Sequence, residues 1–206
     1  MSATISSINY CPVKSLSFQS IDTCEIKKDI GIVGDRIFAF AKDLEADKAL
    51  LFEKNPEERK GKWNKVLTLK NSPVLNKYNF LFKENKLTLT FKEKEILTIN
   101  VSELSQRQLL SNKIIELENS LKEPIVLIKN EALPFFDTSI SNKVDFINSV
   151  SLLNIQSIND FQKKIDKKVE MSRFRGNICI DGIEPWKERE WIGKVIKINN
   201  ISFKVE

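Results

Sequence analysis

The feature that most restricts the fold is an alternation of apolar and polar residues on either side of a short polar turn. Apolar and polar side chains alternate along Tyr78–Lys83 and again along Lys86–Phe91, with Glu84-Asn85 between them. A two-residue period places one apolar face on each strand, so this stretch predicts a β-hairpin. Similar short runs predict further strands at Ile5–Tyr10, Asp22–Lys27, Arg36–Lys42, Trp63–Leu69 and Ile96–Val101. The first hundred residues are therefore expected to be mainly β.

The apolar period changes after Ser102, which is a typical helix N-cap. Apolar residues then follow at helical spacing, and Pro124 ends the pattern; they are Leu110, Ile114, Leu117 and Leu121. A second helix is expected from Ser157, and the stretch from Glu131 to Asp145 is expected to be a loop. Further strands are predicted at Ile125–Lys129, Asn177–Asp181, Lys194–Ile198 and Ile201–Val205. The pattern indicates an α+β, mainly β fold with two or more helices.

The 206 residues include no histidine, which limits the chemistry. Histidine-based nucleophilic triads, zinc sites with imidazole ligands and histidine general bases are all excluded. Cys11, Cys24 and Cys179 are far apart and form no CxxC pair, so a zinc ribbon or disulfide framework is not expected. Each lies in an apolar, strand-like context typical of a buried thiol, and none is a convincing nucleophile.

The formal charge of +5 comes from 33 basic and 28 acidic residues that are intermixed along the chain. This pattern does not predict a nucleic-acid groove, although a small anion remains a possible ligand. No stretch is long and apolar enough to span a bilayer, and the N-terminus does not resemble a signal peptide. We therefore expect a cytoplasmic protein without a membrane partner.

Only six of the 33 basic residues are arginine. A position that keeps arginine in a lysine-rich chain indicates a need for the planar guanidinium fork. Arg36, Arg173 and Arg175 attract interest for this reason. The other three, Arg59, Arg107 and Arg189, lie in charged stretches and are expected to be solvated surface residues.

Four segments contain residues suited to binding or catalysis. Pro12-Val13-Lys14-Ser15 places two donors after a strand, and Gly31-Ile32-Val33-Gly34-Asp35-Arg36 places an ion pair after two turn glycines. The alternatives are a strand-ending turn and a surface pair. Ser172-Arg173-Phe174-Arg175-Gly176-Asn177 suits a phosphate or a planar anion about as well as it suits a surface strand. The run from Asp181 to Gly193 contains two tryptophans and is more typical of a structural loop than of a cleft.

These segments, in this order, resemble those of the MOSC family, named for the C-terminal domain of molybdenum cofactor sulfurase. The closest resemblance is to amidoxime-reducing-component-like members that carry an N-terminal MOSC-associated β-rich domain. The resemblance implies such a domain at residues 1–124 and a MOSC domain with a barrel-like β core at residues 125–206. It also implies a molybdenum cofactor, a phosphorylated pterin that carries a dithiolene.

Family positions that contact the cofactor match Lys14 and Ser15 of PVKS, Arg36 of the Asp-Arg pair, and Arg175 and Asn177 of RFRGN. The last segment has Gly176 where the family has proline. The implied parent activity is two-electron reduction of a small N-hydroxylated substrate at molybdenum, with electrons supplied by a partner redox protein.

Two departures from the family pattern affect this expectation. The run Leu51–Pro56 lacks an arginine that family members carry before a proline, and the chain ends at Glu206 before the expected Arg-Cys pair whose thiolate ligates molybdenum. We therefore expect a C-terminally truncated form with no metal ligand, which binds the cofactor weakly or not at all and lacks reductase activity. The alternatives are a sulfur-carrier or cofactor-handling module and a noncatalytic anion-binding domain.

Overall fold

The structure, a computed structural model, describes residues 3–28, 30–59, 62–121, 124–135 and 149–206. The chain forms two compact units: Tyr10–Ser149, and Met1–Asn9 together with Val150–Glu206. We refer to them as the central unit and the terminal unit. The predicted domain boundary after residue 124 stays a prediction.

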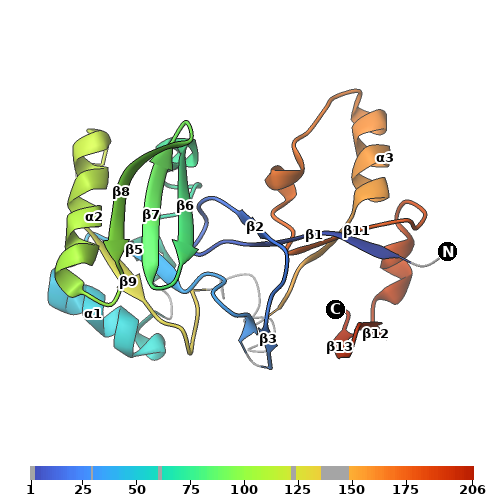
Figure 1. Cartoon of the computed structure of the whole chain (residues 1–206), viewed down its shortest axis with the longest axis horizontal. Helices are drawn as coiled ribbons and strands as arrows, with labels where there is room; N and C mark the ends of the chain where they lie inside the picture. The colour runs from blue at the N-terminus through green and yellow to red at the C-terminus, as the bar shows by residue number, and fades with distance from the viewer. Residues whose placement is uncertain (1–2, 29, 60–61, 122–123, 136–148) are drawn as a thin grey trace. The chain divides into compact units, whose positions relative to one another are not determined.

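A three-stranded antiparallel sheet forms part of the central unit (Figure 1). It consists of β6 (Tyr78–Lys83), β7 (Lys86–Phe91) and β8 (Lys94–Asn100), with Phe80 opposite Leu89 and Leu87 opposite Ile99. These four side chains are at most 1% exposed and belong to the main core of this unit. The hairpin predicted from the alternation is therefore confirmed at both strands.

The second sheet of the central unit pairs β5 (Phe38–Lys42) with β9 (Ile125–Lys129). Phe38 and Phe40 point into the main core, while Ala39 and Ala41 join a second apolar cluster with Phe52. Helix α2 (Leu104–Leu117) buries Leu110 and Ile114 in the main core. Both faces of β5 are thus covered, which explains its nearly continuous apolar sequence.

The structure corrects the sequence analysis of the central unit at one missed helix and two predicted strands. Helix α1 (Ala46–Lys54) was not expected, and its weak amphipathic pattern explains why: it buries only Ala49 and Phe52. The strand expected at Trp63–Leu69 is wrong, because a 3₁₀ turn at Trp63–Lys65 is followed only by an isolated bridge from Val66 to Ala41. The Asn71 side chain accepts from the Thr68 N–H and donates to the Val66 carbonyl. These two backbone groups thus bond to a side chain and not to a neighbouring strand.

The strand expected at Asp22–Lys27 is wrong over most of its length, because only Ile26–Lys27 is a strand and the preceding strand ends before Asp22. Residues Gln19–Ile21 form β2, and β3 (Ile26–Lys27) pairs with β4 (Gly31–Ile32). Two further 3₁₀ turns occur at Pro56–Arg59 and Pro73–Lys77.

The terminal unit contains β1 (Thr4–Tyr10), which runs antiparallel to β11 (Ile178–Asp181), while β10 (Leu152–Asn154) runs parallel to β11. Helix α3 (Ile155–Ile165) begins one turn earlier than expected, because Asn154 and not Ser157 accepts from a first-turn N–H. The predicted terminal hairpin is confirmed as β12 (Val195–Ile198) and β13 (Ile201–Lys204). Short 3₁₀ turns at Met171–Phe174 and Lys187–Trp191 connect these elements.

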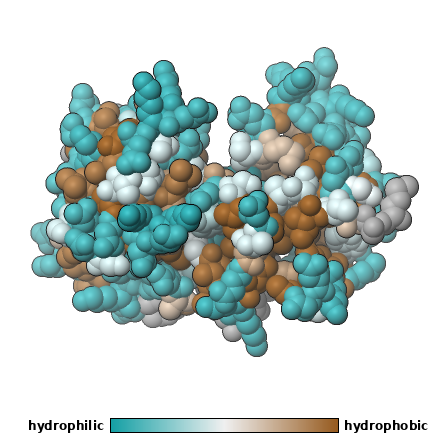
Figure 2. Space-filling model, in the orientation of Figure 1, coloured by the Kyte–Doolittle hydropathy of each residue, from teal (hydrophilic) through white to brown (hydrophobic). Residues whose placement is uncertain are grey.

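The fold is α+β and mainly β, as the sequence pattern predicted. A barrel-like core stays an expectation of the family resemblance. On the face drawn in Figure 2, hydrophobic side chains lie between hydrophilic ones. Exposed large apolar residues of the chain include Leu51, Leu81 and Leu104. In the described part of the chain, no helix is long and apolar enough to cross a membrane.

Candidate functional site

The loop after β1 carries Lys14 and Ser15. It is fixed to the start of β5, because Phe38 N–H donates to the Pro12 carbonyl at 3.0 Å and Lys14 N–H donates to the Phe38 carbonyl at 2.8 Å. Val13 and Leu16 on either side are at most 1% exposed. Two buried apolar anchors and two backbone hydrogen bonds thus hold Lys14, which is itself only 4% exposed.

The turn that ends in Asp35-Arg36 depends on Gly34, whose φ of +90° is rare for other residues. A Cβ at this position would lie 3.2 Å from the ring of Tyr10. Tyr10 is itself buried and donates from its hydroxyl to the Phe82 carbonyl. Burial, followed by the nearby negative charge of Asp35, raises the pKa of Tyr10 to about 12.

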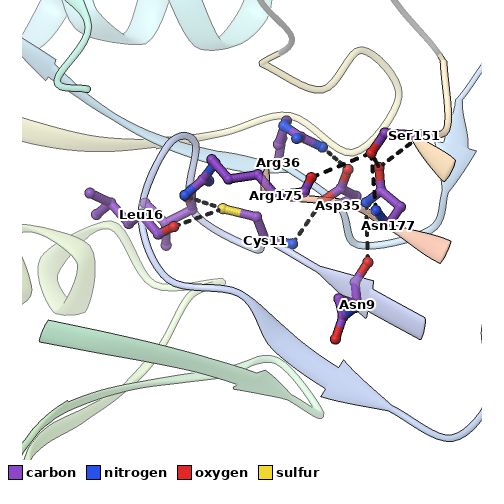
Figure 3. A network of polar contacts seen from close by, with 9 residues as sticks. Asn9, Cys11, Leu16, Asp35, Arg36, Ser151, Arg175 and Asn177 are labelled. Atoms are coloured by element: carbon purple, nitrogen blue, oxygen red, sulfur yellow. Dashed lines mark hydrogen bonds and ion pairs between the residues drawn. The ribbon is translucent and has the colours of Figure 1, made fainter. Parts of the chain in front are cut away.

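Asp35 joins the two loops (Figure 3). Its carboxylate is 2% exposed, accepts from the Cys11 N–H at 2.7 Å and pairs with the Arg36 guanidinium. In addition, Arg36 N–H donates to the Cys11 carbonyl at 2.7 Å. The structure therefore brings the loops that carry Lys14, Ser15 and Arg36 together within the central unit, and the surface pair considered for Asp35 and Arg36 is replaced by a largely buried one.

Three of the five predicted cofactor residues have a left-handed backbone. Ser15, Arg36 and Arg175 have φ of +63°, +54° and +55°. This conformation costs a non-glycine residue about 1–2 kcal/mol, and such residues are concentrated at functional sites. Several other residues in this conformation occupy hairpin turns, as Glu84 and Asn85 do, whereas these three lie on the predicted binding segments.

Arg175 and Asn177 lie in the terminal unit, where Arg175 follows the 3₁₀ turn and Asn177 precedes β11. The Asn177 amide is 1% exposed; it donates to the Asn9 carbonyl at 3.1 Å and accepts from the Ser151 hydroxyl at 2.9 Å (Figure 3). It therefore ties β1 to the segment before β10. This arrangement fixes the position of the backbone that carries Arg175.

Gly176 separates these two residues for a packing reason. A Cβ at this position would lie 2.4 Å from the side chain of Leu153. The alternative reading of this segment as a surface strand is wrong, because Met171–Phe174 is a 3₁₀ turn. Phe174 packs edge-on against Phe161, and Arg173 is exposed.

The segment with two tryptophans is a structural loop, as favoured from its sequence. Glu188 accepts from the Asn154 amide at 2.8 Å and from the Ser157 hydroxyl at 2.7 Å. Trp186 donates from its indole nitrogen to Asp160 at 2.6 Å. Hydrogen bonds from Lys164 and then from Trp186 lower the pKa of Asp160. The polar groups of this loop thus hold it against α3.

The three cysteines differ in exposure, and none of these three forms a disulfide bond. Cys11 is fully buried, with Sγ 2.8 Å from the Val13 carbonyl oxygen, and Cys179 is 4% exposed. Cys24 is partly exposed, and burial raises the pKa of its thiol. Among the described residues, no three His, Cys, Asp or Glu side chains form a group that could hold a metal ion.

Two arginines expected at the surface are buried instead. Arg107 is 8% exposed and forms a bidentate pair with Glu53, at 2.5 and 3.3 Å. Arg59 is 5% exposed and donates to the backbone carbonyls of Phe52 and Leu133. The rarity of arginine in this lysine-rich chain could have indicated that both positions need a guanidinium group. Their charged neighbours in the sequence favoured a surface position instead.

A comparison with known protein families finds a match to part of the chain. The family model of the MOSC domain matches residues 142–206, which include Arg175 and Asn177. The matched segment is similar to the MOSC domain, whose family is associated with the molybdenum cofactor. A search of curated proteins found no match.

Proposed function

We propose that this chain binds the phosphorylated pterin of the molybdenum cofactor through Lys14, Ser15, Arg36 and Arg175, with Asn177 as a supporting residue. The observation that carries the proposal is the MOSC match, because it includes the segment of Arg175 and Asn177. The central unit adds independent support, since the loops of Lys14 and Arg36 are joined by the buried Asp35.

The donor set fits the anionic and polar parts of this group. An ammonium, a hydroxyl and two guanidinium groups supply charge-assisted hydrogen bonds to phosphate oxygens, and guanidinium can bind two oxygens at once. Asn177 has a different role in the proposal, because its amide already bonds to Asn9 and Ser151. It would orient the Arg175 segment and make no direct contact with the ligand.

The cysteines do not fit the metal. Molybdenum favours a soft thiolate ligand, whereas Cys11 and Cys179 are buried and the Cys24 thiol has a raised pKa. We derive no step of the reduction through molybdenum for this chain. The proposal is therefore cofactor binding, and reduction of N-hydroxylated compounds would require a metal ligand that these three residues do not supply.

The test is equilibrium binding of the cofactor's oxidised, fluorescent phosphopterin to the purified chain. Replacing Arg36 or Arg175 with Met should weaken binding about tenfold each, because each change removes hydrogen bonds to a charged group. Lys83→Met is the control, since the Lys83 side chain is 85% exposed. Unchanged affinity in both arginine variants, or no binding by the unmodified chain, would contradict the proposal.

The two alternatives predict different results. A noncatalytic anion-binding domain would bind inorganic phosphate as tightly as the phosphopterin. A sulfur carrier would hold a persulfide, which mass spectrometry detects as one added sulfur atom on a cysteine. The burial of Cys11 and Cys179 disfavours the sulfur-carrier alternative, because sulfur transfer needs an accessible thiolate.

A further inference from the structure

Arg59 lies in the central unit at the end of the 3₁₀ turn Pro56–Arg59. Its Nε donates to the Phe52 carbonyl at 2.8 Å, and its Nη1 donates to the Leu133 carbonyl at 2.7 Å. The guanidinium carbon lies 4.0 Å from the centre of the Phe135 ring. One side chain thus connects the end of α1 with the segment Leu133–Phe135.

These contacts need arginine. A planar fork can donate in two directions while its face covers an aromatic ring, and a lysine ammonium cannot do all three at once. The position is also costly: Arg59 Nη2 is buried without a hydrogen-bond partner among the described residues, and burial lowers the pKa of Arg59 to about 10. A buried charge with an N–H that no described residue pairs contributes little net stability, which indicates that the contacts of Arg59 hold another part of the chain in place.

The contacts of Arg59 lead to Arg36. The Phe135 ring under the guanidinium is fully buried, and Phe135 N–H donates to the Arg36 carbonyl at 2.8 Å. In the same segment, Asn130 N–H donates to the Ile37 carbonyl at 2.8 Å. The stretch from Asn130 to Phe135 therefore holds the backbone around Arg36, whose left-handed conformation needs such support.

We propose that Arg59 is a positioning residue for Arg36: by clamping Leu133 and Phe135, it holds the Arg36 backbone in the conformation that presents its guanidinium to an anion. This inference rests on the proposed function, because it assigns Arg36 a ligand. It gives a role to an arginine that no sequence motif singled out.

The test is a double-mutant cycle on phosphopterin binding. Arg59→Lys keeps the charge and loses the fork, so it should weaken binding about fivefold in the otherwise unmodified chain. In the Arg36→Met background, the same change should have no further effect. Tyr78→Phe is the control for stability alone, because it removes a buried hydrogen bond to Glu118 away from this segment and should leave affinity unchanged.

A second measurement needs no ligand and serves if Arg59→Lys folds poorly. Phe135→Leu keeps the backbone N–H and removes the ring, and we expect faster hydrogen exchange at residue 135 than in Tyr78→Phe. Equal losses of affinity from Arg59→Lys in both backgrounds, or unchanged exchange at residue 135, would overturn the positioning role. If Arg36→Met alone leaves affinity unchanged, the role of Arg59 in binding fails, whereas the proposed function fails only if Arg175→Met leaves affinity unchanged as well.

Discussion

At the residue scale, Glu53 has a position unusual for a carboxylate. It pairs with both terminal nitrogens of Arg107 and also accepts from the Lys129 N–H at 2.9 Å. Three elements, α1, α2 and β9, are therefore joined at one side chain. Because both partners are largely buried, removing either one leaves a charge without its partner.

Glu53→Ala is accordingly expected to lower the free energy of unfolding by about 3 kcal/mol, the cost of leaving one member of a buried pair uncompensated. Urea denaturation followed by circular dichroism measures this change. The matched control is Glu58→Ala, which removes a pair with Lys62 whose side chains are 43% and 51% exposed; it should cost about 0.5 kcal/mol or less. Similar losses in the two variants would show that the Glu53 pair is not effectively buried.

The two tyrosines are expected to make the fold less stable at high pH. Burial, and then Glu118, raise the pKa of Tyr78 to about 12, and Tyr10 is raised to about 12 as well. In the unfolded chain both ionise near their ordinary pKa of about 10. The folded state thus keeps two protons that the unfolded state loses, so stability from these groups is fully present below pH 10 and is lost between pH 10 and 12.

Tyrosinate absorbance and urea denaturation across this range test the prediction. Arg59 acts in the opposite direction, since its lowered pKa releases a proton first in the folded state. The fall in stability should be less steep in Tyr78→Phe, which retains only the contribution of Tyr10. Ionisation of both tyrosines near pH 10 in a chain that is still folded would contradict it.

At the scale of elements, the terminal unit is held together by side chains at the ends of its strands and helix. Asn154 caps α3 and also donates to Glu188, while Asn177 joins β1 to the segment before β10. Gly176 is part of the same arrangement, because Leu153 of β10 occupies the space where its Cβ would be. Close packing explains why this chain has glycine at a position where the resembling family has proline.

Gly176→Ala should therefore destabilise the fold by about 1–3 kcal/mol through overpacking, and Leu153→Ala in the same chain should relieve the clash. Gly193→Ala is the comparison, because Gly193 has a φ of +79° with nothing within 4 Å of a Cβ. Its expected cost of about 1–2 kcal/mol comes from the backbone alone, so truncating Leu153 should not relieve it. Thermal unfolding of the single and double variants gives the coupling; independent effects at Gly176 and Leu153 would contradict the packing argument.

At the scale of the whole molecule, the predicted binding residues are divided between the two units. Lys14, Ser15 and Arg36 lie in the central unit, and Arg175 and Asn177 lie in the terminal unit. The MOSC match includes most of the terminal unit and does not include Lys14, Ser15 or Arg36. The central unit thus has to be tested on its own residues, which is why the binding experiment changes Arg36 and Arg175 separately.

The elements whose signal is local could be predicted from the sequence. The hairpin Tyr78–Phe91 and the terminal hairpin have a two-residue alternation that only one register satisfies, so both were predictable. Helix α2 was predictable from its 3.6-residue period, and the absence of histidine excluded whole classes of chemistry without any structure. The segments of Lys14, Arg36 and Arg175 were also recognisable, because Pro12 marks the first and rare arginines beside turn glycines mark the other two.

The environment of each charged side chain, in contrast, depends on the packed fold. Arg59 and Arg107 lie in charged stretches of sequence, yet both are buried, because their partners Leu133 and Glu53 are 74 and 54 residues away. Ser157 has the sequence of a helix cap but bonds to Glu188, which comes 31 residues later. Local patterns record propensity and period, whereas burial and pairing depend on contacts between distant segments, and those contacts form only when the chain packs.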